Sequence, residues 1–148
     1  MISNIRNSLK RIEGHAIKTP LHLSERLSEK YDCEVYLKRE DLQKTRSFKI
    51  RGSLNKIIKN YESLKTKEIV CASAGNHAQG VAFCCSLLNV KGKIFCPETT
   101  PPQKLKRIQH FGKNTIGLEQ YGNNFNQCLE HAMNYSGETD GIFIHPFN

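Results

Sequence analysis

Residues able to take part in chemistry gather in the run Ser73-Ala74-Gly75-Asn76-His77, which follows a short apolar stretch and precedes a segment with helical spacing. A glycine in such a turn lets the backbone approach a ligand closely. The first N–H groups of the following helix attract anions, together with the positive end of its dipole. The run therefore predicts an anion-binding loop. A simple helix cap at Ser73 or Asn76, with His77 at the surface, explains the same spacing equally well.

A second candidate is Lys49, which lies at the predicted start of a helix, behind the possible cap Ser47. A lysine amine forms Schiff bases with carbonyl compounds when partial burial or nearby positive charge destabilises its ammonium form. The helix N-terminus, Arg46 and Arg51 all act in that direction. Spacing and composition alone still favour an ordinary solvated lysine, because most lysines are exposed. The case for Lys49 as a nucleophile therefore depends on its surroundings.

Alternating strand and helix patterns must position these residues. Five β-rich runs cover residues 34–37, 68–72, 93–96, 115–118 and 141–144. Apolar residues recur with helical spacing on four faces: Leu54/Ile57/Ile58/Tyr61, Ala78/Val81/Ala82/Cys85, Leu105/Ile108/Phe111 and Phe125/Cys128/Leu129/Ala132. From residue 68 onward strands alternate with crossover helices, which predicts an α/β fold with an open parallel sheet and helices on both faces. Ligands in such sheets bind beyond the carboxyl ends of the strands, where the loop at Ser73 would lie.

The overall composition excludes several classes of protein. With 148 residues, 38% hydrophobic and 24% charged, the chain has the make-up of one globular unit. No apolar run approaches the roughly 20 residues that span a bilayer, and no secretory signal is recognisable, so we expect a cytoplasmic protein without a membrane partner. The six cysteines form no Cys-x-x-Cys pair, which indicates buried thiols and no metal site. The net charge of +8 comes from scattered Lys and Arg residues, so we expect no nucleic-acid partner.

Several segments together resemble the fold-type II pyridoxal-phosphate enzymes, most closely the threonine dehydratases of the biosynthetic, isoleucine-pathway kind. The two central motifs are SFKIRGS (residues 47–53) and SAGNHAQGVA (residues 73–82). Other matching segments are TPL (19–21), YLKREDLQ (36–43), IFCPETTPPQK (94–104), YGNNF (121–125) and FIHPFN (143–148). The resemblance therefore extends over nearly the whole chain. One local departure is Arg46, where many relatives have glycine.

The resemblance implies a role for each motif residue. Lys49 would hold pyridoxal 5'-phosphate as a Schiff base, Phe48 would pack beside the cofactor, and Asn76 would hydrogen-bond its ring hydroxyl. The turn that binds the substrate carboxylate would consist of Ser73, Ala74, Gly75, Asn76 and His77. The implied reaction is β-elimination: the freed Lys49 amine takes the α-proton of threonine, the β-hydroxyl leaves, and the products are 2-oxobutanoate and ammonia. Serine dehydratase and serine racemase share these motifs, so serine is an alternative substrate.

The resemblance also implies how the chain is divided. Residues 1–52 would be the incomplete N-terminal part of a large domain, and residues 53–148 a small α/β domain. Family members continue into a run of consecutive glycines that binds the cofactor phosphate, whereas the ten glycines here are never adjacent. We therefore expect that a further C-terminal polypeptide completes an enzyme that is a homo-oligomer in the family. The alternative is a catalytically silent remnant whose small domain folds.

Overall fold

Four parallel strands form the centre of the molecule in the computed structural model, which describes residues 2–147 apart from the side chain of Lys65. They are β3 (Ile69–Ala72), β4 (Gly92–Cys96), β5 (Ile116–Gln120) and β6 (Ile142–Phe143), in the spatial order β5-β4-β3-β6. Ile69 pairs with Gly92 on one side and with Ile142 on the other. The chain thus runs outward from β3 to β5 and then returns across the sheet to β6.

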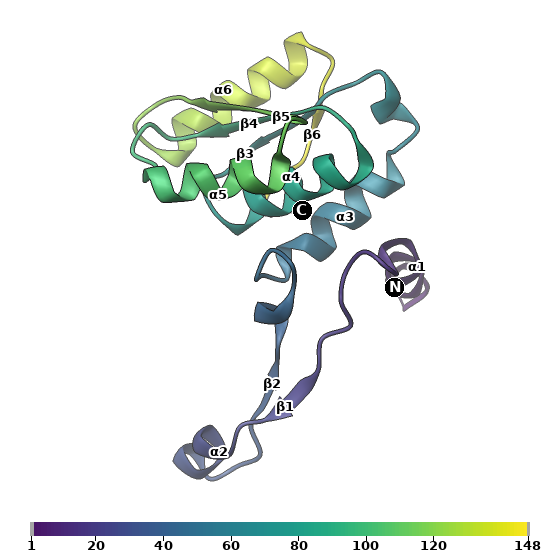
Figure 1. Ribbon diagram of the computed structural model, residues 1–148, viewed down its shortest axis with the longest axis vertical. Helices are drawn as coiled ribbons and strands as arrows, with labels where there is room; N and C mark the ends of the chain where they lie inside the picture. The colour runs from purple at the N-terminus through teal and green to yellow at the C-terminus, as the bar shows by residue number, and fades with distance from the viewer. Residues whose placement is uncertain (1, 148) are drawn as a thin grey trace.

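Helices cover both faces of this sheet (Figure 1). On one face lie α3 (Lys49–Lys59), α4 (Asn76–Leu88) and α5 (Pro102–Gly112), and on the other lies α6 (Phe125–Glu138). Every residue of β3 is buried, because its alternating side chains meet a helix layer on each face. The predicted α/β fold, with a parallel sheet between two helix layers, is confirmed.

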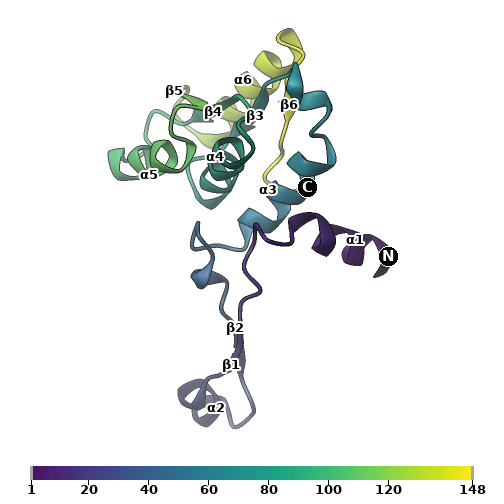
Figure 2. The ribbon, with the colours of Figure 1, turned by 45° about the vertical axis from the view of Figure 1, so that its right-hand side comes forward.

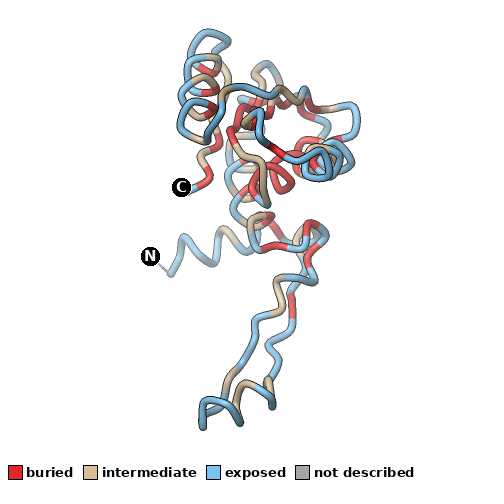
Figure 3. The backbone as a smooth tube through the Cα atoms, turned by 90° about the vertical axis from the view of Figure 1, so that its left-hand side faces the viewer, coloured by how far each residue is buried: buried red, intermediate tan, exposed pale blue. Residues whose placement is uncertain are grey.

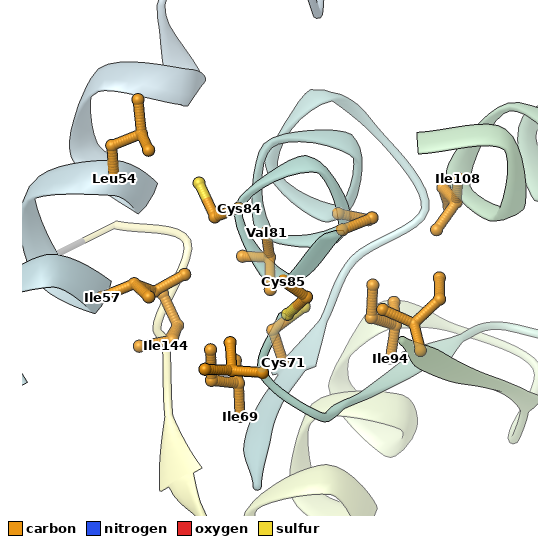
Figure 4. Close-up of a cluster of buried hydrophobic side chains, with 14 of the residues drawn as sticks. Leu54, Ile57, Ile69, Cys71, Val81, Cys84, Cys85, Ile94, Ile108 and Ile144 are labelled. Atoms are coloured by element: carbon orange, nitrogen blue, oxygen red, sulfur yellow. The ribbon is translucent and has the colours of Figure 1, made fainter. Parts of the chain in front are cut away.

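The larger hydrophobic core lies between the sheet and helices α3, α4 and α5. Ile57 of α3 and Val81 of α4 point into it, close to Ile144 just beyond β6 (Figure 4). The helical spacing placed Tyr61 on the same face as Ile57, but α3 ends at Lys59 and Tyr61 is exposed. That part of the pattern was wrong, because α3 ends two residues before Tyr61 and the helical spacing does not extend to it.

A smaller core on the opposite face packs Cys128 of α6 against the sheet. Five of the six cysteines are buried, and Cys33 is exposed. Burial raises the pKa of the Cys85 and Cys96 thiols to about 12. Within residues 2–147, no three His, Cys, Asp or Glu side chains are grouped so as to hold a metal ion, and no helix has the length and apolar character needed to cross a membrane.

The residues before α3 are organised differently from the sheet domain. Helix α1 (Ile2–Ile12) lies against α3, where Arg11 Nε donates a hydrogen bond to Asn55 Oδ1 (2.8 Å). The next part of the chain, residues 21–38, forms an arm that extends away from the body (Figure 1, Figure 3). The arm contains β1 (Leu21–Leu23), α2 (Glu25–Tyr31) and the antiparallel partner β2 (Tyr36–Lys38). Both of its strands are exposed along their whole length, and two-stranded ribbons are marginally stable alone.

Predicted and observed element boundaries agree best within the sheet domain. The runs at 68–72, 93–96, 115–118 and 141–144 are confirmed as β3 to β6, with ends that differ by at most two residues. The run at 34–37 corresponds to β2, and the sequence pattern did not predict α1, β1, α2 or the two 3-10 turns at Glu40–Leu42 and Ser63–Lys65. Helix α3 continues through the boundary proposed between residues 52 and 53, and that division of the chain stays a prediction.

Candidate active site

The candidate residues meet at the carboxyl ends of β3 and β6. β3 leads through the loop at Ser73 into α4, and β6 leads into the segment Ile144–Phe147, which we call the strap. The strand order reverses at β3, and such reversal points form ligand-binding crevices in open parallel sheets. Figure 2 shows the chain after β6 running down to α3, whose first residue is Lys49. The fold therefore brings both central motifs to one crevice.

The loop at Ser73 forms an open helix N-terminus. Gly75 is the N-cap of α4, and the Ser73 hydroxyl accepts a hydrogen bond from the Gly75 N–H (3.2 Å). The first helical hydrogen bond of α4 runs from the Gln79 N–H to the Gly75 carbonyl (3.2 Å). The N–H groups of Asn76 and His77 precede that bond and point toward any anion at the helix start. Neither Ser73 nor Asn76 caps the helix through its side chain in the described structure, so the simple-cap alternative is wrong.

His77 is buried, with only 7% of its surface exposed, so the alternative that placed His77 at the surface is wrong. Its Nε2 lies 2.9 Å from the Ile144 carbonyl oxygen. Because a carbonyl only accepts, Nε2 carries the proton of the neutral ring. Burial lowers the pKa of His77 below 6.5 against the opposing effect of the Ile144 carbonyl, and electrostatic interactions with Lys49 and His145 lower it further. The neutral side chain therefore ties α4 to the strap.

The amine of Lys49 is enclosed by the strap. Nζ donates a hydrogen bond to the Pro146 carbonyl (2.6 Å) and lies 5.7 Å from the ring centroids of both Phe48 and Phe147. Rings at this distance attract an ammonium group. The N-cap of α3 is Phe48, not Ser47 as predicted, yet the Ser47 hydroxyl accepts a hydrogen bond from the Lys49 N–H (3.3 Å). Lys49 is half-buried and partnered, unlike an ordinary solvated lysine.

Of the two arginines near Lys49, Arg51 is paired with groups other than the Lys49 amine. Arg51 forms an ion pair with Glu40 (2.8 Å) and also donates to the Ile17 carbonyl (2.8 Å). Its guanidinium holds the pKa of Glu40 down at about 2, and the Arg51 charge is compensated there. Arg46 has a φ of 55°, in the left-handed region that favours glycine. A glycine would adopt this backbone conformation at no steric cost, so Arg46 is held in it by its surroundings.

Close packing of α3 against α4 keeps Lys49 beside the loop. A Cβ at Gly80 would lie 3.0 Å from Ser53 Oγ and 3.4 Å from the Lys49 carbonyl group. Glycine therefore permits the two helices to approach at this level. Ser53 is buried, and its hydroxyl finds no hydrogen-bond partner within residues 2–147. Both residues belong to the central motifs, but no spacing rule predicts a contact between helices so far apart in the sequence.

A cavity of about 400 Å³ opens beside Lys49, between α3, the start of α4 and the strap. Of the predicted site residues, Phe48, Lys49 and His77 line it, whereas Ser73–Asn76 do not. The side chain of Asn76 is exposed at the first position of α4. The strap supplies lining residues to which the sequence assigned no role, although the motif FIHPFN marked the segment as part of the family pattern.

Most of the chain matches one protein family. A family model described as pyridoxal-phosphate dependent enzyme matches residues 12–148. The chain belongs to this family. The predicted family and its cofactor, pyridoxal phosphate, are confirmed at this level.

One curated enzyme and two solved structures are similar to nearly the whole of this chain. The chain is 47% identical over 145 residues to the biosynthetic L-threonine dehydratase IlvA of Staphylococcus aureus, a match that covers 98% of this chain and 34% of the relative. The solved threonine deaminase isoform 2 of Solanum lycopersicum is 36% identical, with a TM-score of 0.83 over 98% of this chain and 40% of that one. Maize serine racemase is 28% identical, with a TM-score of 0.87 over 99% and 44% of the two chains. The chain thus spans about a third of the length of the curated relative, 34%.

Proposed function

We propose that this chain contributes the lysine and the carboxylate loop of a pyridoxal-phosphate-dependent β-elimination, which converts L-threonine to 2-oxobutanoate and ammonia. The observation that carries the proposal is the position of the Lys49 amine, at a cavity of about 400 Å³ beside the N-terminal turn of α4. The 47% identity to a biosynthetic threonine dehydratase supports threonine as the substrate. We extend the proposal to a role in isoleucine biosynthesis in the cytoplasm.

The residues present suit an aromatic aldehyde cofactor. Lys49 supplies a primary amine that can condense with the aldehyde, and the Phe48 ring lies 5.7 Å from that amine. The exposed amide of Asn76 can hydrogen-bond a ring hydroxyl. When bound, pyridoxal phosphate supplies an electron sink for the α-carbon of an amino acid. These three residues would hold the cofactor.

The residues of the chain would then handle the substrate. The N–H groups of the turn Ser73–His77 would bind the substrate carboxylate at the start of α4, where the helix dipole favours negative charge. Lys49, once released from the Pro146 carbonyl, would take the α-proton as a general base. Loss of the β-hydroxyl as water then follows. The neutral ring of His77 adds no positive charge beside the amine that must accept this proton.

We further propose that a C-terminal polypeptide, equivalent to the rest of the relatives, completes the phosphate site in a homo-oligomeric enzyme. The chain covers 40% of the tomato enzyme and has no adjacent glycines. Leu21, Leu23 and Tyr36 on the arm are exposed by 61%, 48% and 50%. An apolar surface of this kind is suited to burial against further protein. The alternative is a catalytically silent chain whose sheet domain folds by itself.

A second candidate function is chemistry on serine. Maize serine racemase matches 99% of this chain with a TM-score of 0.87, so the local architecture is compatible with either amino acid. Measuring ammonia release from threonine and from serine, with the chain alone and with the added C-terminal polypeptide, separates the two. Activity on serine only would eliminate the threonine proposal, and cofactor binding without turnover under both conditions would favour the silent chain.

Titration of the purified chain with pyridoxal phosphate tests the role of Lys49 directly. We expect the visible absorbance of a Schiff base, which should disappear in Lys49→Ala. The matched control is Lys56→Ala, which removes another lysine from the lining of the same cavity and should leave the absorbance in place. Loss of the band in both variants, or retention in both, would contradict the assignment of Lys49.

A further inference from the structure

The strap is held by hydrogen bonds from two different helices. His77 of α4 donates from Nε2 to the Ile144 carbonyl (2.9 Å), and Lys49 of α3 donates from Nζ to the Pro146 carbonyl (2.6 Å). The two acceptors are two residues apart on one short segment. The Ile144 N–H also donates to the Val70 carbonyl of β3 (2.8 Å), so His77 and Lys49 act on a segment whose start is paired with the sheet.

The strap has little freedom to absorb a shift. Ile144 is part of the larger core, Pro146 is buried, and the proline ring fixes its own φ. Two residues span at most about 7 Å, so a displacement at Ile144 is passed on to the Pro146 carbonyl. Phe147 is 77% exposed, and its ring makes an edge contact with Phe125 at 6.4 Å.

The electrostatic surroundings favour a neutral side chain at the position of His77. The charged and titratable groups that act on His77 are Lys49 and His145, both cationic when protonated. No carboxylate from the described part of the chain lines the cavity. A neutral imidazole can donate to the Ile144 carbonyl without repelling the Lys49 ammonium, whereas a lysine or arginine in its place would add charge.

We propose that His77 is a positioning residue for Lys49, which it influences through the strap. By holding the Ile144 carbonyl, the His77 side chain keeps the Pro146 carbonyl on the Lys49 amine and so sets how readily that amine meets an electrophile. Lys49 condenses with an aldehyde only as a free amine: the C=O bond is replaced by C=N, and water leaves. The strap therefore competes with the cofactor for Lys49. This role of the side chain is separate from that of the His77 N–H in the carboxylate turn.

The reactivity of Lys49 can be measured without cofactor or substrate, so the result is independent of the proposed function. The native chain is treated with a low concentration of acetic anhydride, and acetylation of each lysine is followed by peptide mass spectrometry. Lys104, an exposed lysine on α5, serves as the internal reference. We expect the rate ratio of Lys49 to Lys104 to be several-fold lower in the native protein than in urea.

Substitutions at His77 then test its influence. His77→Leu should raise the native ratio about fivefold, the change expected from the loss of one neutral hydrogen bond. His77→Gln keeps an N–H donor that can reach the Ile144 carbonyl, and should restore the low ratio. His131→Leu removes a histidine of α6 that stacks on Tyr121, and as a matched control it should leave the ratio unchanged. An unchanged ratio in His77→Leu, or no rescue by His77→Gln, would overturn the proposal.

A change at the far end of the strap keeps the test decisive if His77→Leu fails to fold. Phe147→Ala removes the ring 5.7 Å from Lys49 Nζ and should raise the Lys49 ratio by itself. In the double variant with His77→Gln the rise should equal that of Phe147→Ala alone, because the tie is retained. A Lys49 ratio that stays low in Phe147→Ala would show that the strap does not protect the amine, and would refute the proposal.

Discussion

The Glu40 carboxylate joins the base of the arm to the helix that carries Lys49, and we predict that its removal weakens this junction. It accepts hydrogen bonds from Arg51 Nε and Nη2 (both 2.8 Å), from Thr19 Oγ1 and from Gln43 Nε2 (3.3 Å). Only 17% of its side chain is exposed. These partners, Arg51 foremost, lower the pKa of Glu40 from 4.5 to about 2.

The depressed pKa sets both the size and the direction of the effect. A change from 4.5 to about 2 corresponds to about 3 kcal/mol of stability, and remaining contact with water reduces the expected value to about 2 kcal/mol. The folded state prefers the ionised carboxylate, so this stability is complete above about pH 4.5. It is lost as the pH falls toward about 2, because the unfolded chain binds the proton first.

Urea unfolding followed by far-UV circular dichroism measures this contribution. At about pH 7, Glu40→Gln should have a free energy of unfolding lower than wild type by about 2 kcal/mol, and the gap should close near pH 2. The matched control is Asp41→Asn, which breaks the exposed pair with Arg39 and should have little effect, as is usual for surface ion pairs. A gap that is absent at neutral pH, or that persists unchanged in acid, would refute the reasoning.

Three further predictions concern the core, a helix cap and a buried histidine. Ile57→Ala should lower the free energy of unfolding by about 2–4 kcal/mol, because Ile57 is fully buried between α3 and the sheet; Leu87→Ala, at a side chain 38% exposed, should cost clearly less in the same urea titration. Asn124→Ala removes the side-chain acceptor of the Gln127 N–H (3.0 Å) at the N-cap of α6. It should cost about 1 kcal/mol, visible as a lower Tm in calorimetry, and an unchanged Tm would argue against the cap. The pKa of His77 is lowered below 6.5, chiefly by burial, so wild type should lose stability relative to His77→Gln as the pH falls below about 6.5; equal losses in urea titrations from about pH 8 to 5 would contradict this.

The parts of the fold that could be predicted from sequence are those built from buried, regular segments. Residues 69–72 are apolar without alternation and are bounded by charge and by Ser73, a pattern typical of a strand covered on both faces. The arm could not be read in this way. Its strands have three residues each and are exposed on both faces. Because neither face is buried, burial imposes no alternation of apolar and polar residues on these strands. Helix α1 carries Ile2, Ile5 and Leu9 at helical spacing, and that signal could have identified it.

In the candidate site too, features set by neighbouring residues could be predicted, whereas contacts between distant residues could not. The open N-terminus of α4 follows from Gly75 and the start of the helix, both of which are local. The sequence did not predict a partner for Arg51, because Glu40 is brought to it by the tertiary fold from a turn 11 residues away. The alternative that placed His77 at the surface was wrong for a similar reason. Its burial is produced by the strap, which comes from a segment 67 residues away.

By itself, then, the sequence determined which segments are strands and helices in the sheet domain, and which two motifs carry the lysine and the anion loop. Those properties follow from hydrophobic period, turn residues and helix starts, which depend on neighbours a few residues apart. Only the tertiary structure decided that β6 pairs with β3 and that the Pro146 carbonyl meets Lys49 across 97 residues. Such contacts arise because burying both faces of the sheet selects one arrangement of distant segments, and no local pattern encodes which partners that arrangement brings together.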